Sequence, residues 1–257
     1  MICVTGAERT YSELSQRLDR YAHLPLQEVR LDCLKQPAEA WNQLCEGVPK
    51  TQRARWIVTS RPDRDEAESV PSKESRLRLL EAALAAGVGW VDLEWEAGEA
   101  SLARMVRVAG PGRVLVSHHL YHPRWEEAEI RKLLAAMAAT PAHGVKLALA
   151  VEDVSQLREV RALGEFFFKK FDKPLVLVPM CGAGVVGRVL YPQLHSAWTY
   201  AAATAAVATA PGQLTVEELA AMGVPHDKGQ SPPLLVLFGE DQVLRSLGPP
   251  VYNTLFR

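Results

Sequence analysis

Short apolar runs recur along the chain at a regular interval, and segments with helical signals separate them. Eight runs have the length and composition of strands: Ile2–Thr5, Glu28–Leu34, Arg55–Arg61, Trp90–Glu96, Arg113–His119, Gly144–Ala150, Pro174–Met180 and Ser196–Ala202. Strand–helix alternation is typical of parallel βαβ units. Eight such units favour a closed (β/α)8 barrel of the TIM type, within the α/β class, over an open sheet.

Capping signals support the helices between these strands. Thr10 and Thr215 each stand three residues before a glutamate, which is the pattern of a capping box. Further helices are expected after Ser72, over Glu126–Ala139 and after Asp153 or Ser155, because leucines and other apolar residues follow there at spacings of three and four.

Composition narrows the class of protein. The chain has 257 residues, 48% of them hydrophobic, and a formal net charge of −1, which excludes a disordered protein and argues against a nucleic-acid binder. No apolar run approaches the roughly 20 residues that cross a bilayer. The N-terminus lacks the basic and apolar regions of a signal peptide, so a cytoplasmic location is expected.

Cysteines and glycine motifs give no sign of a metal or cofactor. The four cysteines are scattered, without a C-x-x-C pair or a histidine at ligand spacing, so we expect buried free thiols, no disulfides and no metal site. No G-x-G-x-x-G opens a helix after a strand, which argues against a dinucleotide-binding domain in the barrel stretch.

Charged residues share one face of several predicted strands. Glu28, Arg30 and Asp32 alternate with apolar residues, and Asp92 and Glu94 do the same in a later strand. In an antiparallel meander this face would be solvated. The intervening helices favour parallel pairing, which turns the face into the barrel. The ionisable residues expected there are Glu28, Asp32, Asp92 and Glu94, balanced by Arg30, Arg61, Lys146 and Arg188.

A paired ionic cluster in a barrel is a candidate active site, since buried charges are costly without partners. An ammonium such as Lys146, in a partly apolar site beside arginines, readily loses its proton and can attack a ketone. A histidine such as His119 can then move a proton at the neighbouring carbon. Residue chemistry alone thus predicts a Schiff-base lyase or aldolase that acts on a small carboxylated or phosphorylated ketone.

Six short motifs in order resemble the type I 3-dehydroquinate dehydratases. They are Glu28-Val29-Arg30-Leu31-Asp32, Thr59-Ser60-Arg61, Asp92-Leu93-Glu94, Ser117-His118-His119-x-x-His122, Val145-Lys146-Leu147-Ala148 and Ala210-Pro211-Gly212-Gln213. The resemblance covers residues 1–225 and implies a barrel that converts 3-dehydroquinate to 3-dehydroshikimate in aromatic biosynthesis. It also implies a lysine Schiff base, syn elimination, a homodimer, and no metal or cofactor.

The resemblance also implies roles for individual residues. Lys146 resembles the Schiff-base lysine, His119 the general base and acid, and Glu94 a residue that orients this histidine or contacts substrate hydroxyls. The residues that resemble substrate contacts are Glu28, Arg30, Arg61, Arg188 (for the carboxylate), Thr209 and Gln213.

Two departures from the family's pattern concern substrate positioning. Gly187 stands where the family has serine, and the acid usually found after the third strand has no clear counterpart among the acids of residues 63–68. His118 has outward parity, so we expect it to pack toward the helices. His122 is expected to give outer support.

Residues 226–257 break the alternation. A linker rich in proline leads to one further strand, and the motifs after it resemble the start of a shikimate dehydrogenase. The chain is therefore expected to be the dehydratase part of a fusion of the two activities.

Two other functions stay open at this stage. One is another class I aldolase-type barrel, for which Cys181-Gly182-Ala183-Gly184 is a weak phosphate-loop candidate. The other is an inactive barrel that serves as a binding module.

Overall fold

Eight parallel strands form the centre of the computed structural model, which describes residues 1–62, 72–109 and 113–224. The strands are β1 Ile2–Thr5, β2 Leu26–Arg30, β3 Trp56–Thr59, β4 Trp90–Glu94, β5 Val114–Leu120, β6 Gly144–Ala150, β7 Leu175–Met180 and β8 Thr199–Ala202. Their order is β7-β6-β5-β4-β3-β2-β1-β8. The amide of Ala197 donates to the carbonyl of Leu175 at 2.7 Å, which brings the approach to β8 beside β7. The predicted barrel is confirmed.

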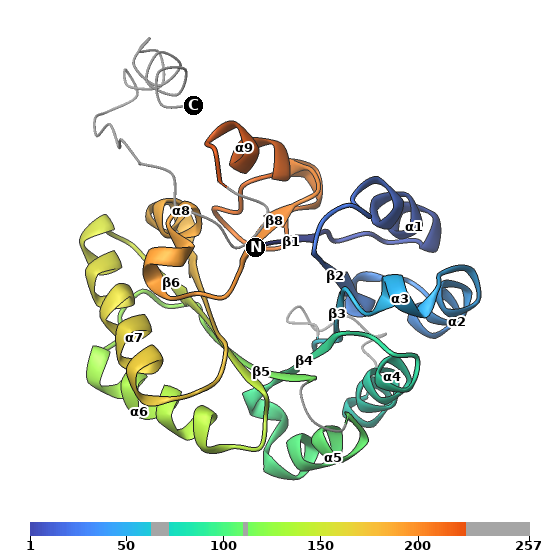
Figure 1. Cartoon of the computed structure of the whole chain (residues 1–257), viewed down its shortest axis with the longest axis horizontal. Helices are drawn as coiled ribbons and strands as arrows, with labels where there is room; N and C mark the ends of the chain where they lie inside the picture. Colours follow the sequence, from blue (N-terminus) through green and yellow to red (C-terminus); the bar gives the residue numbers. More distant parts are fainter. Residues whose placement is uncertain (63–71, 110–112, 225–257) are drawn as a thin grey trace.

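Helices surround the strands on the outside (Figure 1). They are α1 Tyr11–Arg20, α2 Pro37–Gly47, α3 Lys50–Arg53, α4 Lys73–Ala85, α5 Glu99–Ala109, α6 Glu127–Ala139, α7 Leu157–Lys170, α8 Cys181–Val189 and α9 Val216–Ala221. Thr10 and Thr215 form the predicted capping boxes, and Ser72 caps α4. Asp153 caps a short 3-10 turn that leads into α7, which satisfies amides at the helix start.

The barrel interior has an apolar lower layer and a polar upper layer. Ile57, Leu115 and Val176 are buried there with Trp198, and the half-buried indole of Trp90 packs on Trp198 at a ring-centroid distance of 6.0 Å. Two residues further along the strands, this inward face carries Thr59, Ser117 and other polar groups, which are also buried. The ionic groups therefore lie on a dry apolar floor, toward the carboxyl ends of the strands.

Three strands end earlier than the alternation predicts, and one of them, β3, stops at Thr59 instead of Arg61. β2 stops at Arg30 and continues as a 3-10 turn, η1 Leu31–Cys33, while β4 stops at Glu94 before η2 Trp95–Ala97. A barrel strand must end where the chain turns out toward its helix, and apolar–polar alternation persists into that turn. Asp32 consequently folds back on Arg30 at the barrel mouth, and the prediction that it points inward from a strand is wrong.

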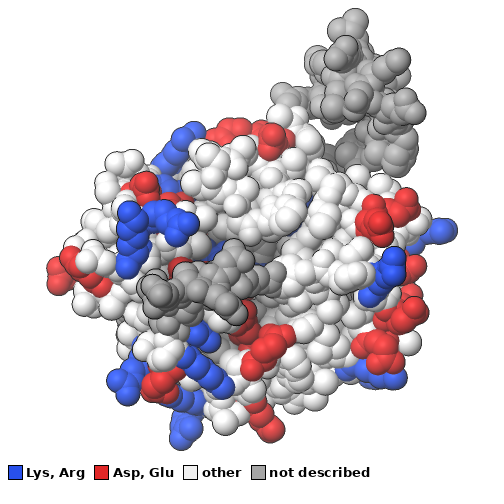
Figure 2. Space-filling view, turned by 180° about the vertical axis from the view of Figure 1, so that it is seen from behind, with Lys and Arg blue, Asp and Glu red and all other residues white. Residues whose placement is uncertain are grey.

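The surface and the cysteines match a charge-balanced chain with free thiols. Figure 2 shows positive and negative side chains interspersed around the rim of one face. The cysteines are free, but only Cys3 is buried and the other three are half-buried. Within the described residues, no helix is long and apolar enough to cross a membrane. The acid sought among residues 63–68 and the separate segment expected over 226–257 lie outside the described residues.

Candidate active site

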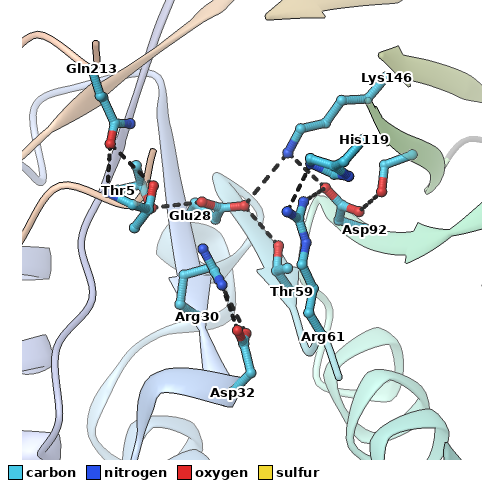
Figure 3. A network of polar contacts seen from close by, with 12 residues as sticks. Thr5, Glu28, Arg30, Asp32, Thr59, Arg61, Asp92, His119, Lys146 and Gln213 are labelled. Atoms are coloured by element: carbon cyan, nitrogen blue, oxygen red, sulfur yellow. Dashed lines mark hydrogen bonds and ion pairs between the residues drawn. The ribbon is translucent and has the colours of Figure 1, made fainter. Parts of the chain in front are cut away.

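Lys146 lies at the centre of the buried ionic network. It is the third residue of β6, its side chain is 5% exposed, and its Nζ is 2.9 Å from Asp92 Oδ2 and 3.8 Å from Glu28 Oε1. Figure 3 shows the amine reaching from β6 toward both carboxylates. From the sequence, arginines are expected beside this amine, whereas its ion-pair partners are carboxylates. The amine therefore enters any reaction from an ion pair, and a proton must leave it first.

Asp92 connects three groups of the site. It is buried on β4, accepts a hydrogen bond from Ser117 Oγ at 2.5 Å, and pairs with Arg61 Nη2 at 3.3 Å as well as with Lys146. Burial alone would raise the pKa of Asp92, but the cations of Lys146 and Arg61 outweigh burial and hold that pKa well below its usual range. Asp92 is thus a fixed anion of the site. Its strand parity indicated an inward side chain, but Asp92 is assigned no catalytic or binding role from the sequence.

Glu28 is the second anion of the network. Its carboxylate accepts hydrogen bonds from Thr5 Oγ1 at 2.6 Å and Thr59 Oγ1 at 2.8 Å (Figure 3). Burial opposes the charge, but Lys146 and Arg30 outweigh it and keep the pKa of Glu28 below its usual value. Because neighbouring strands hold both carboxylate oxygens, the position of this charge is fixed relative to Lys146.

His119 stands near the end of β5 with its ring held from one side. Its Nε2 lies 2.8 Å from Arg61 Nη1, and since a guanidinium can only donate, Nε2 accepts and the ring is neutral. Tyr121 stacks on the ring at a centroid distance of 5.8 Å. His118 points the other way and bonds Glu96 of η2, so its outward parity is confirmed. His122 is exposed and accepts the amide of Arg124 at 3.2 Å.

Arg188 is a buried cation without a counter-charge among the described residues. It lies in α8, is 1% exposed, and none of its three guanidinium nitrogens has a hydrogen-bond partner in the part of the chain that the structure describes. Burial lowers the pKa of Arg188 to about 10. Arg30, by contrast, is paired in a fork with Asp32, at 3.1 and 2.5 Å. Arg188 is therefore the donor group best placed to receive an anion.

The loop after β8 reaches the same place. Gln213 Oε1 accepts hydrogen bonds from the amide and the hydroxyl of Thr209, at 2.7 and 3.1 Å. The amide of Cys181, at the start of α8, donates to the carbonyl of Pro211 at 3.1 Å. Gly212 has φ +71°, and a Cβ there would lie 2.3 Å from the Cys181 carbonyl oxygen. Glycine at this position lets the loop dock closely on α8.

One cavity, open to solvent, joins these parts. Of the site residues predicted from the sequence, it is lined by Lys146, His119, Glu28, Arg30, Arg61, Arg188, Thr209 and Gln213. Glu94 is half-buried, burial raises its pKa, and it lines a separate hollow with Trp95 and Gly98. The other described lining residues are Ala210 and Pro211 of the loop motif, and Tyr121, Ala148, Val178, Met180 and Tyr200, to which no site role is assigned from the sequence. Strand parity indicates most of these, but ionisable side chains alone do not reveal them.

The arrangement suits chemistry at a carbonyl group of an anionic substrate. An amine, a neutral imidazole and an unpaired guanidinium open on one cavity, so one small molecule can meet all three. The Cys181-Gly182-Ala183-Gly184 segment, the candidate phosphate loop, forms the first turn of α8 instead of a loop. A carboxylate gripped by Arg188 fits this site better than a phosphate in a glycine-rich loop.

Comparisons with known proteins agree with this chemistry. A family model described as type I 3-dehydroquinase matches residues 2–222. A 3-dehydroquinate dehydratase from Syntrophobacter fumaroxidans is 29% identical over 82% of this chain and 90% of its own length. One from Escherichia coli is 29% identical over 82% of this chain and 81% of its own.

Solved structures share the fold. A type I 3-dehydroquinate dehydratase from Clostridium difficile superposes with a TM-score of 0.73 at 22% identity, covering 85% of this chain and 88% of its own. A dehydroquinate dehydratase and shikimate dehydrogenase from S. pombe has a TM-score of 0.67 at 21% identity and covers 86% of this chain, which matches 43% of that protein. At these identities the likeness shows the barrel alone.

The family model spans nearly the whole barrel, and the relatives from Syntrophobacter fumaroxidans and Escherichia coli carry the same name. These findings decide for dehydration over the aldolase and binding-module alternatives. The chain belongs to the type I 3-dehydroquinase family, and its reaction is the conversion of 3-dehydroquinate to 3-dehydroshikimate in the shikimate pathway.

Proposed function

We propose that Lys146 forms the Schiff base with the ketone of 3-dehydroquinate and that His119 moves the proton. The observation that carries this proposal is the shared cavity: it is lined by the Lys146 amine, the neutral His119 ring and the Arg188 guanidinium, which has no hydrogen-bond partner among the described residues. The neutral imidazole can accept a proton at Nε2, the nitrogen with the lone pair, once the Arg61 guanidinium releases that nitrogen. The carbonyl carbon and the carbon beside it can then lie within reach of the amine and the imidazole.

The reaction runs in four steps. Nζ of Lys146, after losing its proton, attacks the ketone carbon, and loss of water from the carbinolamine gives a protonated imine. His119 removes a proton from the carbon next to the imine, and the C–H electrons form an enamine. The enamine electrons expel the β-hydroxyl, which takes the proton from His119 and leaves as water. Hydrolysis of the conjugated imine consumes one water and frees Lys146, so the net loss is one water.

The remaining residues bind and orient the substrate. Arg188 grips the carboxylate through its guanidinium fork, and Arg30 and Arg61 contribute further donors at the rim. Glu28 fixes the position of Lys146, while the loop that holds Thr209 and Gln213 closes over the bound molecule. The electrostatic coupling of Glu94 to Arg61 supports a role in orienting Arg61 and His119.

Borohydride trapping tests the covalent step. With 3-dehydroquinate present, borohydride should reduce the imine, inactivate the enzyme and leave a stable adduct on the Lys146 peptide, located by mass spectrometry. Lys146→Met should give no adduct. The exposed Lys169 and the neighbouring Lys170 serve as internal controls, because both lie at the end of α7 and neither lines the cavity. An adduct on either of them, with Lys146 unmodified, contradicts the proposal.

Replacement of His119 tests the proton transfer. His119→Ala should lower kcat by about 10²–10⁴-fold, the usual contribution of a positioned general base. Borohydride should still trap the imine in this variant, since attack by the amine does not need the imidazole. His118→Ala is the matched control, because that ring points to Glu96 on the other side of the strand. Equal losses of kcat in the two variants would show that His119 is not the base.

The setting of the enzyme is a further part of the proposal. The family resemblance supports a homodimer in the cytoplasm, and light scattering of the purified chain tests the dimer. The motifs within residues 226–257 support a link to a shikimate dehydrogenase domain, fused or neighbouring, as the S. pombe protein has both names. Co-purification with that second activity from the native source tests the link.

A further inference from the structure

Tyr200 is an aromatic residue of the cavity to which the mechanism gives no role. It lies on β8, paired in register with Cys3 of β1, and both side chains belong to the cluster inside the barrel. It is 4% exposed and lines the cavity that Lys146, His119 and Arg188 share. A tyrosine so placed is shielded from solvent but accessible to whatever fills the cavity.

The ring of Tyr200 faces the reacting amine. Nζ of Lys146 lies 4.2 Å from the ring centroid, well within the distance at which a cation is attracted to an aromatic face. The hydroxyl of Tyr200 lies near the Trp198 side chain but makes no hydrogen bond of regular geometry among the described residues. The contact between Tyr200 and Lys146 therefore runs through the ring.

The chemistry at Nζ changes which contacts can hold it. An ammonium has three N–H donors, and those of Lys146 can serve both Asp92, at 2.9 Å, and Glu28, at 3.8 Å. A protonated imine has a single N–H, so at most one carboxylate keeps its hydrogen bond. The attraction of a ring face needs no N–H, and it is stronger for a cation that has lost competing hydrogen bonds, as the imine nitrogen has. The contact with the Tyr200 ring therefore contributes more to the position of the nitrogen in the imine than in the free amine.

We propose that the ring face of Tyr200 stabilises the protonated imine of Lys146 and keeps its nitrogen in place over the barrel floor. This inference rests on the proposed role of Lys146 as the Schiff-base lysine. It assigns the Tyr200 ring to the covalent intermediate and assigns no part to the Tyr200 hydroxyl. The intermediate is a cation in a buried site, where such contacts are strongest.

A series of substitutions at Tyr200 tests the effect of the ring's negative face while the shape of the ring stays nearly the same. Tyr200 is replaced by phenylalanine and then by mono-, di- and trifluorinated phenylalanines, whose ring faces are progressively less negative. The readout is the rate of inactivation by borohydride at a fixed, saturating concentration of 3-dehydroquinate, which follows the fraction of enzyme present as imine. Tyr200→Phe should keep the parent rate. The rate should then fall stepwise, by about tenfold to thirtyfold over the series, the range expected for a desolvated cation–π contact.

Phe167 is the matched control position. It is buried in α7 and packs on Phe171 at a centroid distance of 5.0 Å, in the outer core between strands and helices. The same fluorinated series there should leave the inactivation rate unchanged, because no cation of the reaction contacts this ring. The free energy of unfolding, measured for each variant, separates a local effect at Nζ from a general loss of packing.

Three results would overturn the inference. A flat rate across the Tyr200 series shows that the ring face does not stabilise the imine. A full loss already in Tyr200→Phe assigns the effect to the hydroxyl. If the parent enzyme gives no adduct on Lys146, the proposed function itself has failed, and the inference falls with it. A parent adduct on Lys146 combined with a flat series rejects the role of Tyr200 alone.

Discussion

Arg188 shows how a single residue can exchange stability for binding. Its guanidinium is 1% exposed and has no hydrogen-bond partner among the described residues, so the folded chain carries the desolvation cost of a cation. Arg17 is also buried, but it donates to Glu8 at 2.7 Å and to the backbone carbonyl of Glu28 at 2.7 Å. The two arginines are similarly buried but differ in their hydrogen-bond partners. A comparison of the two positions therefore isolates the effect of those partners on stability.

The same substitution should therefore have opposite effects on stability at these two positions. Arg188→Met removes an unpaired charge and should raise the free energy of unfolding by about 1–3 kcal/mol, while kcat/KM falls because the carboxylate loses its grip. Arg17→Met leaves Glu8 buried without a partner and should lower the free energy of unfolding by about 3–5 kcal/mol. Urea unfolding and steady-state kinetics check both. Destabilisation by Arg188→Met would mean that the guanidinium has a partner in the free enzyme.

Strand parity predicted most of the ionic residues of the site, but not how they pair. Alternation placed Glu28, Asp92 and Lys146 on the inward face, and the structure confirms it. Parity indicates on which face of its strand a side chain lies. Which side chains then form ion pairs depends on the register between neighbouring strands. The sequence therefore did not indicate which of the inward carboxylates would pair with Lys146. Tyr200 was missed for another reason, because an aromatic residue in a strand normally fills a core.

At the scale of elements, the site depends on where strands stop and loops dock. β2 and β4 end in 3-10 turns that the periodicity predicted as further strand residues, since apolar–polar alternation alone does not mark where a barrel strand turns away. The loop over residues 209–213 is held by its contact with the first residue of α8. Such a contact joins distant parts of the chain, and no local pattern indicates it.

Gly212 is the point at which this loop is most sensitive. Its φ is +71°, and a Cβ added there would lie only 2.3 Å from the Cys181 carbonyl oxygen, so Gly212→Ala should push the loop off α8. We expect kcat/KM to fall by about 10–100-fold, since misplacement near 1 Å can cost that much. Gly182→Ala, where added atoms meet open space, is the control and should leave the kinetics intact. Unchanged kinetics in Gly212→Ala would show that the loop does not position the substrate.

At the scale of the whole molecule, the fold and the reaction belong to the same stretch of chain. Eight strand–helix units were predictable because each strand is short and apolar and capped helices recur between strands, so local signals repeat. The family model ends at residue 222, and every described residue that lines the cavity falls between Glu28 and Gln213. The segment over 226–257 lies beyond both, and its role is open to a direct test.

A chain that stops after Gly229 should dehydrate 3-dehydroquinate as the full chain does. The described barrel contains the amine, the imidazole and the donor groups that the mechanism uses, and α9 covers β8 before the segment begins. Steady-state kinetics of the two chains should agree, and their unfolding transitions should coincide. A fall in kcat/KM of about tenfold, equal to about 1.4 kcal/mol of transition-state stabilisation, with unfolding unchanged, would mean that residues after 229 reach the cavity. The segment would then be part of the dehydratase site, and its resemblance to a shikimate dehydrogenase would not indicate its function.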